Sequence, residues 1–264
     1  MKQQQVCQQM ELIAAVAKDM RDPAAVILLA KDSLQKNALP YVPQQMQEKV
    51  QFSLDCIQKN VNRIERVSMN LTDLARSVCG ELRPRWQPVC LSEACSQICE
   101  QARLFRSGKG ISCNLPKQPV VSLMDEYFFD RILLNLLSNA MNACPDGKIS
   151  VDLKVSGQEI LLVVTDNGPG LPSDRLQQPF APVYRSETAQ TKLGLHLCSV
   201  LANQMNAVLC AENMPMGGAR FILKIPVRSD GQETAFFAAD SKQSMQMRRQ
   251  CVSVEFAGFE KAET

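Results

Sequence analysis

Histidine, aromatic residues and long apolar runs are scarce in this chain of 264 residues. With a single histidine, His196, the chain cannot form a metal site from several imidazoles. The longest apolar runs, 24–30 and 160–164, are far shorter than the roughly 18 residues that span a bilayer, so no membrane segment is expected. The amino terminus is polar with no apolar core after it, which predicts no signal peptide.

The net charge and the positions of the cysteines narrow the class of protein further. The formal net charge is only +2, and no basic block or aromatic-interleaved patch appears, which argues against nucleic-acid binding. The 11 cysteines lie in apolar or helical stretches, as expected for reduced thiols in a cytoplasmic protein. Cys90, Cys95 and Cys99 lack a CxxC pair, so core packing is expected of them rather than zinc binding. A hydrophobic fraction of 45% is enough for one large or two small folded domains.

Residues 1–80 carry two heptad patterns, typical of long helices. Between them, the segment 37–43 contains two prolines and must break the helix. We therefore expect an antiparallel helical hairpin, which pairs with a second hairpin as a dimeric four-helix bundle. A coiled-coil stalk without a signalling role is the alternative. The apolar positions are Val6, Met10, Ile13, Ala17, Met20, Ala24 and Ile27, then Val50, Leu54, Ile57, Val61, Ile64, Leu71, Ala75 and Val78, with Ser68 in the same row.

From about residue 81 to residue 227 the pattern alternates between strands and helices, which favours an α/β sandwich and an α+β fold overall. The tail from 228 to 264 is rich in Ser, Gln and Met, and its segment 251–259 fits either a strand or a helix. The expected strands are 85–90, 111–115, 120–123, 148–155, 159–165 and 219–227, and the expected helices are 92–105, 126–144 and one after Gly194.

Three asparagines on one helix and a glycine-rich acidic turn carry the chemistry. Asn135, Asn139 and Asn142 follow one another at helical spacing and share a face among apolar residues. One strand later, Asp166-Asn-Gly-Pro-Gly170 places a carboxylate in an open turn. Such a carboxylate can bind an amine such as that of adenine, and asparagine oxygens suit Mg²⁺ and its phosphates. The sequence predicts a nucleotide pocket, with structural hydrogen bonding of the asparagines as the alternative.

These motifs resemble those of the histidine-kinase branch of the GHKL ATPases, and the resemblance covers about residues 8 to 227. Residues 135–142 resemble the N box, 166–170 the first glycine box, 178–180 the F box, 192–195 the end of the second glycine box, and 217–221 the last glycine turn. The resemblance implies a two-component transmitter that binds ATP and Mg²⁺, with Asn139 as the Mg²⁺ ligand. The implied ATP-binding residues are Asn135, Asn139, Asn142, Asp166, Gly168, Gly170, Arg185, Lys192 and Gly194.

The chain departs from that family at the phosphoacceptor. Residues 17–23 resemble the H box, but Lys18 stands where the family has histidine, next to Asp19 at the acid position. An imidazole is nucleophilic near neutral pH, whereas a lysine amine is mostly protonated. We therefore expect no autophosphorylation in cis, and a solvated helix face for Asp19 and Arg21.

The ATP-binding motifs depart from the family too. Gln190-Thr191-Lys192 replaces two glycines of the lid; Lys192 either contacts the γ-phosphate or is a surface lysine. Many relatives have a lysine at the position of Asn142. An asparagine at position 135 cannot act as the general base that hydrolysing GHKL branches use. Asp130 is expected to face solvent, and His196 to have a packed structural role.

Three hypotheses follow. The first is a transmitter that forms a homodimer or heterodimer and serves a response regulator, either as a pseudokinase or by phosphorylating a partner in trans. The second is a non-enzymatic dimeric scaffold that no longer binds ATP. The third, a serine-directed anti-sigma kinase, shares the ATP-binding domain but does not need the hairpin.

Overall fold

The computed structural model describes residues 2–105, 110–182 and 193–228, together with residues 248, 251, 252 and 254–256. The chain forms two compact units. One consists of Met1–Leu82 with Val254–Glu260, and the other of Arg83–Ser253 with Lys261–Thr264.

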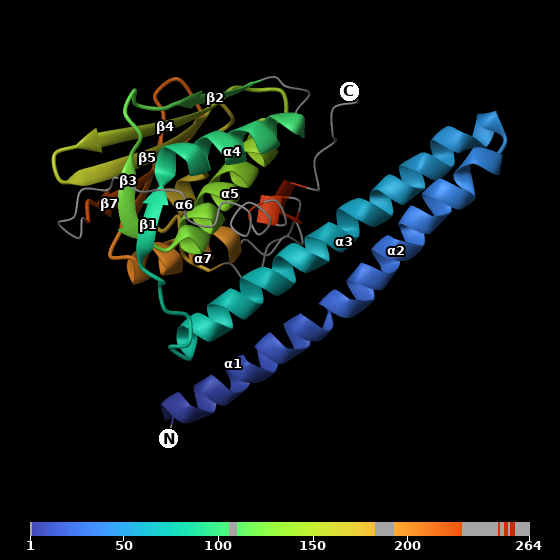
Figure 1. Cartoon of the computed structure of the whole chain (residues 1–264), viewed down its shortest axis with the longest axis horizontal. Helices are drawn as coiled ribbons and strands as arrows, with labels where there is room; N and C mark the ends of the chain where they lie inside the picture. Colours follow the sequence, from blue (N-terminus) through green and yellow to red (C-terminus); the bar gives the residue numbers. More distant parts are fainter. Residues whose placement is uncertain are drawn as a thin grey trace. The chain divides into compact units, whose positions relative to one another are not determined.

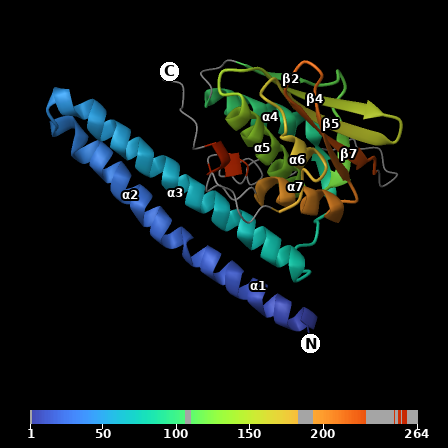
Figure 2. The ribbon, with the colours of Figure 1, turned by 180° about the vertical axis from the view of Figure 1, so that it is seen from behind.

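The first unit is a helical hairpin. Helices α1 (Lys2–Asp19) and α2 (Arg21–Asn37) run beside α3 (Gln44–Val78) in both views (Figures 1 and 2). The connection holds a short 3₁₀ helix, η1 (Leu39–Tyr41), with Pro40 near its start, and Pro43 precedes α3 as its N-cap residue. The prolines therefore end one helix and begin the next, as their fixed φ and missing N–H groups dictate.

The first helix of the hairpin is divided at Met20, where one continuous helix was expected. Pro23 has no N–H to donate to the carbonyl of Asp19, so the ladder of hydrogen bonds loses one rung there. The backbone of Met20 remains helical, at φ −71° and ψ −19°. The chain consequently continues in nearly the same direction through the break.

Six of the sixteen positions of the heptad pattern are buried. Leu54, Val61, Ser68 and Ala75 of α3, each seven residues after the last, are buried. Ala17 and Ala24 are buried at the matching positions of α1 and α2. A second row, also at steps of seven, is 41% to 52% exposed; it consists of Val6, Ile13, Met20, Ile27 and Leu34. We call these five residues the exposed heptad row.

The second unit is an α/β sandwich. Its five-stranded sheet has the order β2-β4-β5-β7-β6, with β2 and β4 parallel and the other pairs antiparallel. Helices α4, α5 and α7 form a layer on one face of this sheet (Figure 1). The strands are β2 (Ile111–Asn114), β4 (Ile149–Ser156), β5 (Glu159–Asp166), β6 (Val208–Asn213) and β7 (Ala219–Pro226), and the helices are α4 (Leu91–Leu104), α5 (Glu126–Ala143), α6 (Ser173–Leu176) and α7 (Leu193–Gln204).

Two features of the sheets go beyond the strand ranges that were expected. β1 (Gln87–Cys90) and β3 (Val121–Met124) pair with each other in a separate two-stranded sheet. β7 is an inner strand, because β6 pairs outside it. Strand β6 was not predicted; its residues are half-buried or exposed, so the apolar alternation that identifies a strand is weak.

The described part of the tail is helical where either a helix or a strand was considered. Residues 251, 252 and 254–256 are in helix. Within the hairpin unit, Glu255 is 2% exposed and lies 3.5 Å from Arg66, with which it forms an ion pair. Among the described residues, no helix is long and apolar enough to cross a membrane.

Candidate nucleotide-binding site

Helix α5 begins and ends at residues whose chemistry sets its limits. The Asp125 carboxylate accepts a hydrogen bond from the amide of Phe128 at 2.8 Å and one from the amide of Arg85 at 2.7 Å. It is an N-cap that also fixes the preceding segment, and such a cap stabilises a helix by about 1 kcal/mol. At the other end, Pro145 cannot continue the helix, which stops at Ala143.

The three asparagines of α5 have different environments. Asn135 is 3% exposed and donates through Nδ2 to the carbonyl of Arg131 at 2.8 Å. Asn142 is exposed and donates in the same way to Ser138 at 2.8 Å. Asn139 is half-buried, and no described residue hydrogen-bonds to its carboxamide. Of the three, Asn139 has the side chain that is available to a ligand.

The acidic turn presents one carboxylate oxygen and anchors the other. Asp166, at the end of β5, is 4% exposed, and its Oδ1 accepts from the amide of Gly168 at 2.8 Å and of Ala219 at 3.3 Å. Neither hydrogen bond uses Oδ2, and no described donor contacts that atom. Hydrogen bonds to a charged acceptor are worth about 1.5–3 kcal/mol, so the carboxylate is held in one orientation. Its second oxygen can accept from a ligand.

Glycines allow the backbone segments around Asp166 to approach closely. A Cβ on Gly218 would lie 1.9 Å from the carbonyl oxygen of Asp166, and φ at Gly218 is +94°. A Cβ on Gly168 would lie 2.9 Å from the carbonyl oxygen of Ala143, at the end of α5. The glycine turns therefore bring the acidic turn against the helix that carries the asparagines, as the sequence predicts for one pocket.

Asn213 closes the turn and was not predicted. Its Oδ1 accepts from the amide of Leu171 at 2.7 Å, and its Nδ2 donates to the carbonyl of the same residue at 2.8 Å. The carboxamide thus replaces a pair of backbone hydrogen bonds and ties the end of β6 to the loop after Gly170. Gly170 itself has φ +80°, which a residue with a Cβ rarely adopts.

Helix α7 lies against Asn135. A Cβ on Gly194 would lie 2.4 Å from Oδ1 of Asn135, so a larger residue there would have to displace the Asn135 side chain. Nδ1 of His196 lies 3.0 Å from the carbonyl oxygen of Phe180, and this contact links α7 to the segment that resembles the F box. Two predicted phosphate contacts, Arg185 and Lys192, fall outside the described residues.

Comparisons with known proteins fit this geometry. Residues 124–229 match the family described as "Histidine kinase-, DNA gyrase B-, and HSP90-like ATPase". The sensor protein KdpD of Escherichia coli K12 is 29% identical over 225 residues, which is 81% of this chain and 24% of that protein. KdpD of Mycobacterium tuberculosis CDC 1551 is 26% identical over 83% of this chain and 26% of that protein. These findings support a sensor histidine kinase transmitter with a GHKL ATPase domain.

Three further comparisons extend the match. The adaptive-response sensory kinase SasA of Synechocystis sp. PCC 6803 is 25% identical over 82% of this chain and 59% of that protein. The transmitter thus spans between about a quarter and three-fifths of these relatives. The fold matches full-length ShkA, solved with AMPPNP, at a TM-score of 0.64 and 21% identity over 83% of this chain and 46% of that one. It also matches the Acinetobacter baumannii histidine kinase AdeS at a TM-score of 0.54 and 19% identity, over 78% of this chain and 96% of that one.

The segment 17–23, which resembles the H box, covers the end of α1 and the start of α2. Lys18 and Asp19 are exposed at the end of α1, the environment that was expected for Asp19. Arg21 differs from that expectation: its guanidinium donates to Ser68 at 3.0 Å and to Thr72 at 3.3 Å. Ser68 in turn donates to the carbonyl of Ala17. Arg21 is therefore part of the hairpin's packing rather than of a solvated face.

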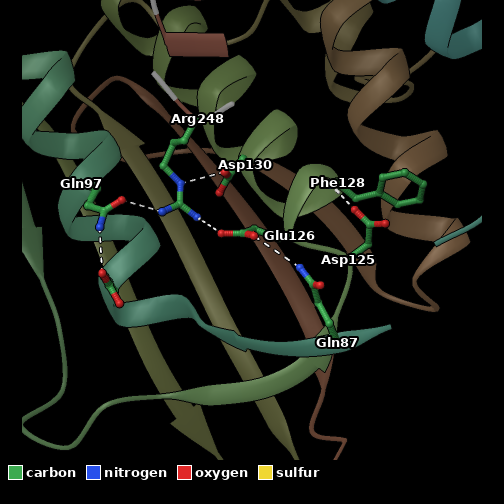
Figure 3. A network of polar contacts seen from close by, with 8 residues as sticks. Gln87, Gln97, Asp125, Glu126, Phe128, Asp130 and Arg248 are labelled. Atoms are coloured by element: carbon green, nitrogen blue, oxygen red, sulfur yellow. Dashed lines mark hydrogen bonds and ion pairs between the residues drawn. The ribbon is translucent and has the colours of Figure 1, made fainter. Parts of the chain in front are cut away.

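Asp130 was expected to face solvent, and the structure contradicts this. It is 5% exposed, and its Oδ2 lies 2.7 Å from Nε of Arg248 in the tail (Figure 3). Arg248 also binds Glu126 of α5 and Gln97 of α4, each at 2.6 Å. The spacing of α5 alone could not reveal this partner, which lies 118 residues away in sequence. Burial raises the pKa of Asp130 to about 7, although Arg248 acts in the opposite direction.

We predict that ionisation of Asp130 destabilises the transmitter's second unit as the pH rises. An unfolded aspartate loses its proton near pH 3.9, whereas the folded carboxyl keeps it to about 7. The folded state therefore binds more protons between these values, and the free energy of unfolding falls by at most about 1.4 kcal/mol per pH unit. Denaturant unfolding at several pH values, followed by the fluorescence of the single tryptophan, Trp86, measures this change in the free energy of unfolding. Asp130→Asn should flatten this slope and the exposed control Asp146→Asn should keep it; equal slopes in both variants would contradict the assignment.

Proposed function

We propose that the second unit binds Mg-ATP between the Asp166 turn, α5 and α7. The observation that carries this is the geometry of Asp166, whose Oδ1 is anchored by two backbone amides while Oδ2 has no described donor. A carboxylate held in this way can accept a hydrogen bond from the adenine amine. The match to a GHKL family and the likeness to a kinase solved with AMPPNP support the same ligand.

Asn139 is suited to hold Mg²⁺ beside the phosphates. Its carboxamide has no hydrogen bond from a described residue, whereas Asn135 and Asn142 both donate to carbonyls of their own helix. Amide oxygens are hard ligands of the kind that Mg²⁺ takes together with phosphate oxygens and water. The amino-terminal end of α7, at Gly194, offers backbone amides to the phosphates, with Arg185 and Lys192 as the proposed cationic contacts.

In this proposal the transmitter does not phosphorylate itself in cis. Lys18 is exposed on α1, and an exposed ammonium is not a nucleophile at neutral pH. Asn135 cannot serve as the general base for hydrolysis, because an amide does not accept a proton in this pH range. The protein therefore acts as a nucleotide-binding pseudokinase or phosphorylates the histidine of a partner hairpin in trans, in a pathway with a response regulator.

The hairpin supports a dimer. Five large apolar side chains of the exposed heptad row lie at steps of seven along α1 and α2. Such a row is the seam of a helical bundle, and a second hairpin would bury it as a four-helix bundle. We accordingly assign dimerisation to residues 1–80 and nucleotide binding to residues 81–227. All 11 cysteines are free thiols, which supports a cytoplasmic location.

The nucleotide proposal is tested with Asp166→Asn. Asparagine keeps an oxygen for the amide of Gly168 but loses the charge that would bind adenine, so the affinity for Mg-ATP should fall by about 10- to 100-fold. Calorimetric titration with Mg-ATP measures the effect. Glu159→Gln, the same change at the other end of β5, is the matched control and should leave affinity unchanged. No binding by the unmodified protein at millimolar Mg-ATP would overturn the proposal and leave the non-enzymatic scaffold.

Restoring an acceptor tests the assignment of Lys18. Lys18→His should yield a phosphate bond that is labile in acid and stable in base when the protein is incubated with radiolabelled Mg-ATP, since imidazole is nucleophilic near neutral pH. Lys36→His places an imidazole at an exposed site near the hairpin loop and should remain unlabelled. If Lys18→His binds ATP but is not labelled, the missing histidine is not the sole defect, and the altered segment 190–192 becomes the site of the block.

The exposed heptad row is tested by placing a charge in it. Ile27→Glu should weaken self-association by at least about tenfold, because a carboxylate would be buried without a partner at the seam. Leu29→Glu is the matched control: Leu29 is 70% exposed and lies about 200° further round the same helix. Sedimentation equilibrium measures both. A monomeric unmodified protein, or equal effects of the two variants, would contradict a homodimer through this row.

A further inference from the structure

Two cysteines and a glutamate meet where the first helix begins and the third ends. Cys7 and Glu11 are one turn apart on α1, so their side chains share a face. Cys79 is the C-cap residue of α3. The two Sγ atoms and a carboxylate oxygen of Glu11 all lie within 4.8 Å of one another. We propose that Cys7, Glu11 and Cys79 form a binding site for a thiophilic divalent cation, with Zn²⁺ as its occupant.

The distances are close to those that a tetrahedral zinc ion needs. With Zn–S bonds of about 2.3 Å, two sulfur ligands lie about 3.8 Å apart, and a sulfur and a carboxylate oxygen about 3.5 Å apart. Cys7 Sγ already lies 3.7 Å from Oε1 of Glu11. Shifts of about 1 Å or less would bring all three atoms to coordination distance, which rotation about side-chain bonds can supply.

The chemistry of the donors selects the ion. Thiolates favour Zn²⁺ over Mg²⁺ and Ca²⁺, and a carboxylate is a common third ligand of zinc. In the metal-free state, Cys79 donates to the backbone carbonyl of Cys7, and a hydrogen bond with Cys79 raises the pKa of Cys7 to about 12. A thiol that binds the ion does so as the thiolate, so binding releases protons. The bound unit has a net charge of −1, and water fills the fourth position.

The surroundings allow the ion to enter and give it a structural consequence. Both cysteines are half-buried and Glu11 is exposed, so the cluster is accessible from solvent. The ligands come from the start of α1 and the end of α3, the open end of the hairpin. An ion there cross-links two helix termini that no loop connects directly, and metal binding to the folded form adds to its stability.

Cobalt binding tests the site. The full chain, kept reduced with a phosphine, is titrated with Co²⁺ and followed by thiolate-to-cobalt charge-transfer absorption. We expect one Co²⁺ per chain, displaced by Zn²⁺, and an affinity at least about tenfold lower in Cys7→Ser and in Cys79→Ser. Cys56→Ser removes another half-buried cysteine of the hairpin unit and should bind as the unmodified protein does.

The outcome that overturns the proposal is equally specific. The site is excluded if the unmodified protein shows no charge-transfer absorption, or if the absorption persists unchanged in Cys7→Ser and Cys79→Ser. It is also excluded if Cys7 and Cys79 form a disulfide and the reduced protein binds no cobalt. Circular dichroism of the metal-free variants controls for folding. Zn²⁺ should raise the unfolding temperature of the unmodified protein and of Cys56→Ser, but not of Cys7→Ser.

Discussion

Helix α5 is buried along most of its length, and each polar group on it therefore needs an internal partner. Asp125 serves as its N-cap, Asp130 pairs with Arg248, and Asn135 donates to the carbonyl of Arg131. Leaving such a group unsatisfied costs about 1–3 kcal/mol, more if it is charged. The polar pattern of α5 therefore determines what packs around it. Of the three asparagines of α5, Asn139 is the one whose carboxamide has no hydrogen bond from a described residue, and the proposed ligand site lies on its side of the helix.

The same burial explains how the pocket is assembled. The acidic turn lies close to the end of α5 at Gly168, and the turn before β7 lies close to the Asp166 carbonyl at Gly218. Gly194 of α7 lies close to the side chain of Asn135 on α5. Each close approach removes space that a side chain would fill and leaves backbone amides at the surface of the pocket. The glycines thus position the Asp166 carboxylate and the backbone around it. These close approaches depend on the small size of the glycines and not on their flexibility.

The sequence predicted the elements whose signals are local. Helix α5 has a cap, an apolar pattern and a terminating proline, and the β4–β5 hairpin alternates around Gly157, whose φ is +60°. The misses depend on contacts between distant residues. Asn213 binds Leu171 across 42 positions, and Arg248 binds Asp130 across 118. No periodicity encodes such pairs, because side-chain spacing reports which face is buried but not what covers it.

Lysine rather than histidine at position 18 has little physical consequence for the hairpin. Lys18 is exposed, so replacing one polar side chain by another there removes no buried contact, and surface substitutions typically change stability by less than about 0.5 kcal/mol. The neighbouring contacts that do support the fold, from Arg21 to Ser68 and Thr72, remain in place. Phosphoacceptor chemistry and helix packing are therefore separable in this unit. A hairpin with lysine at position 18 can therefore still present the exposed heptad row to a partner.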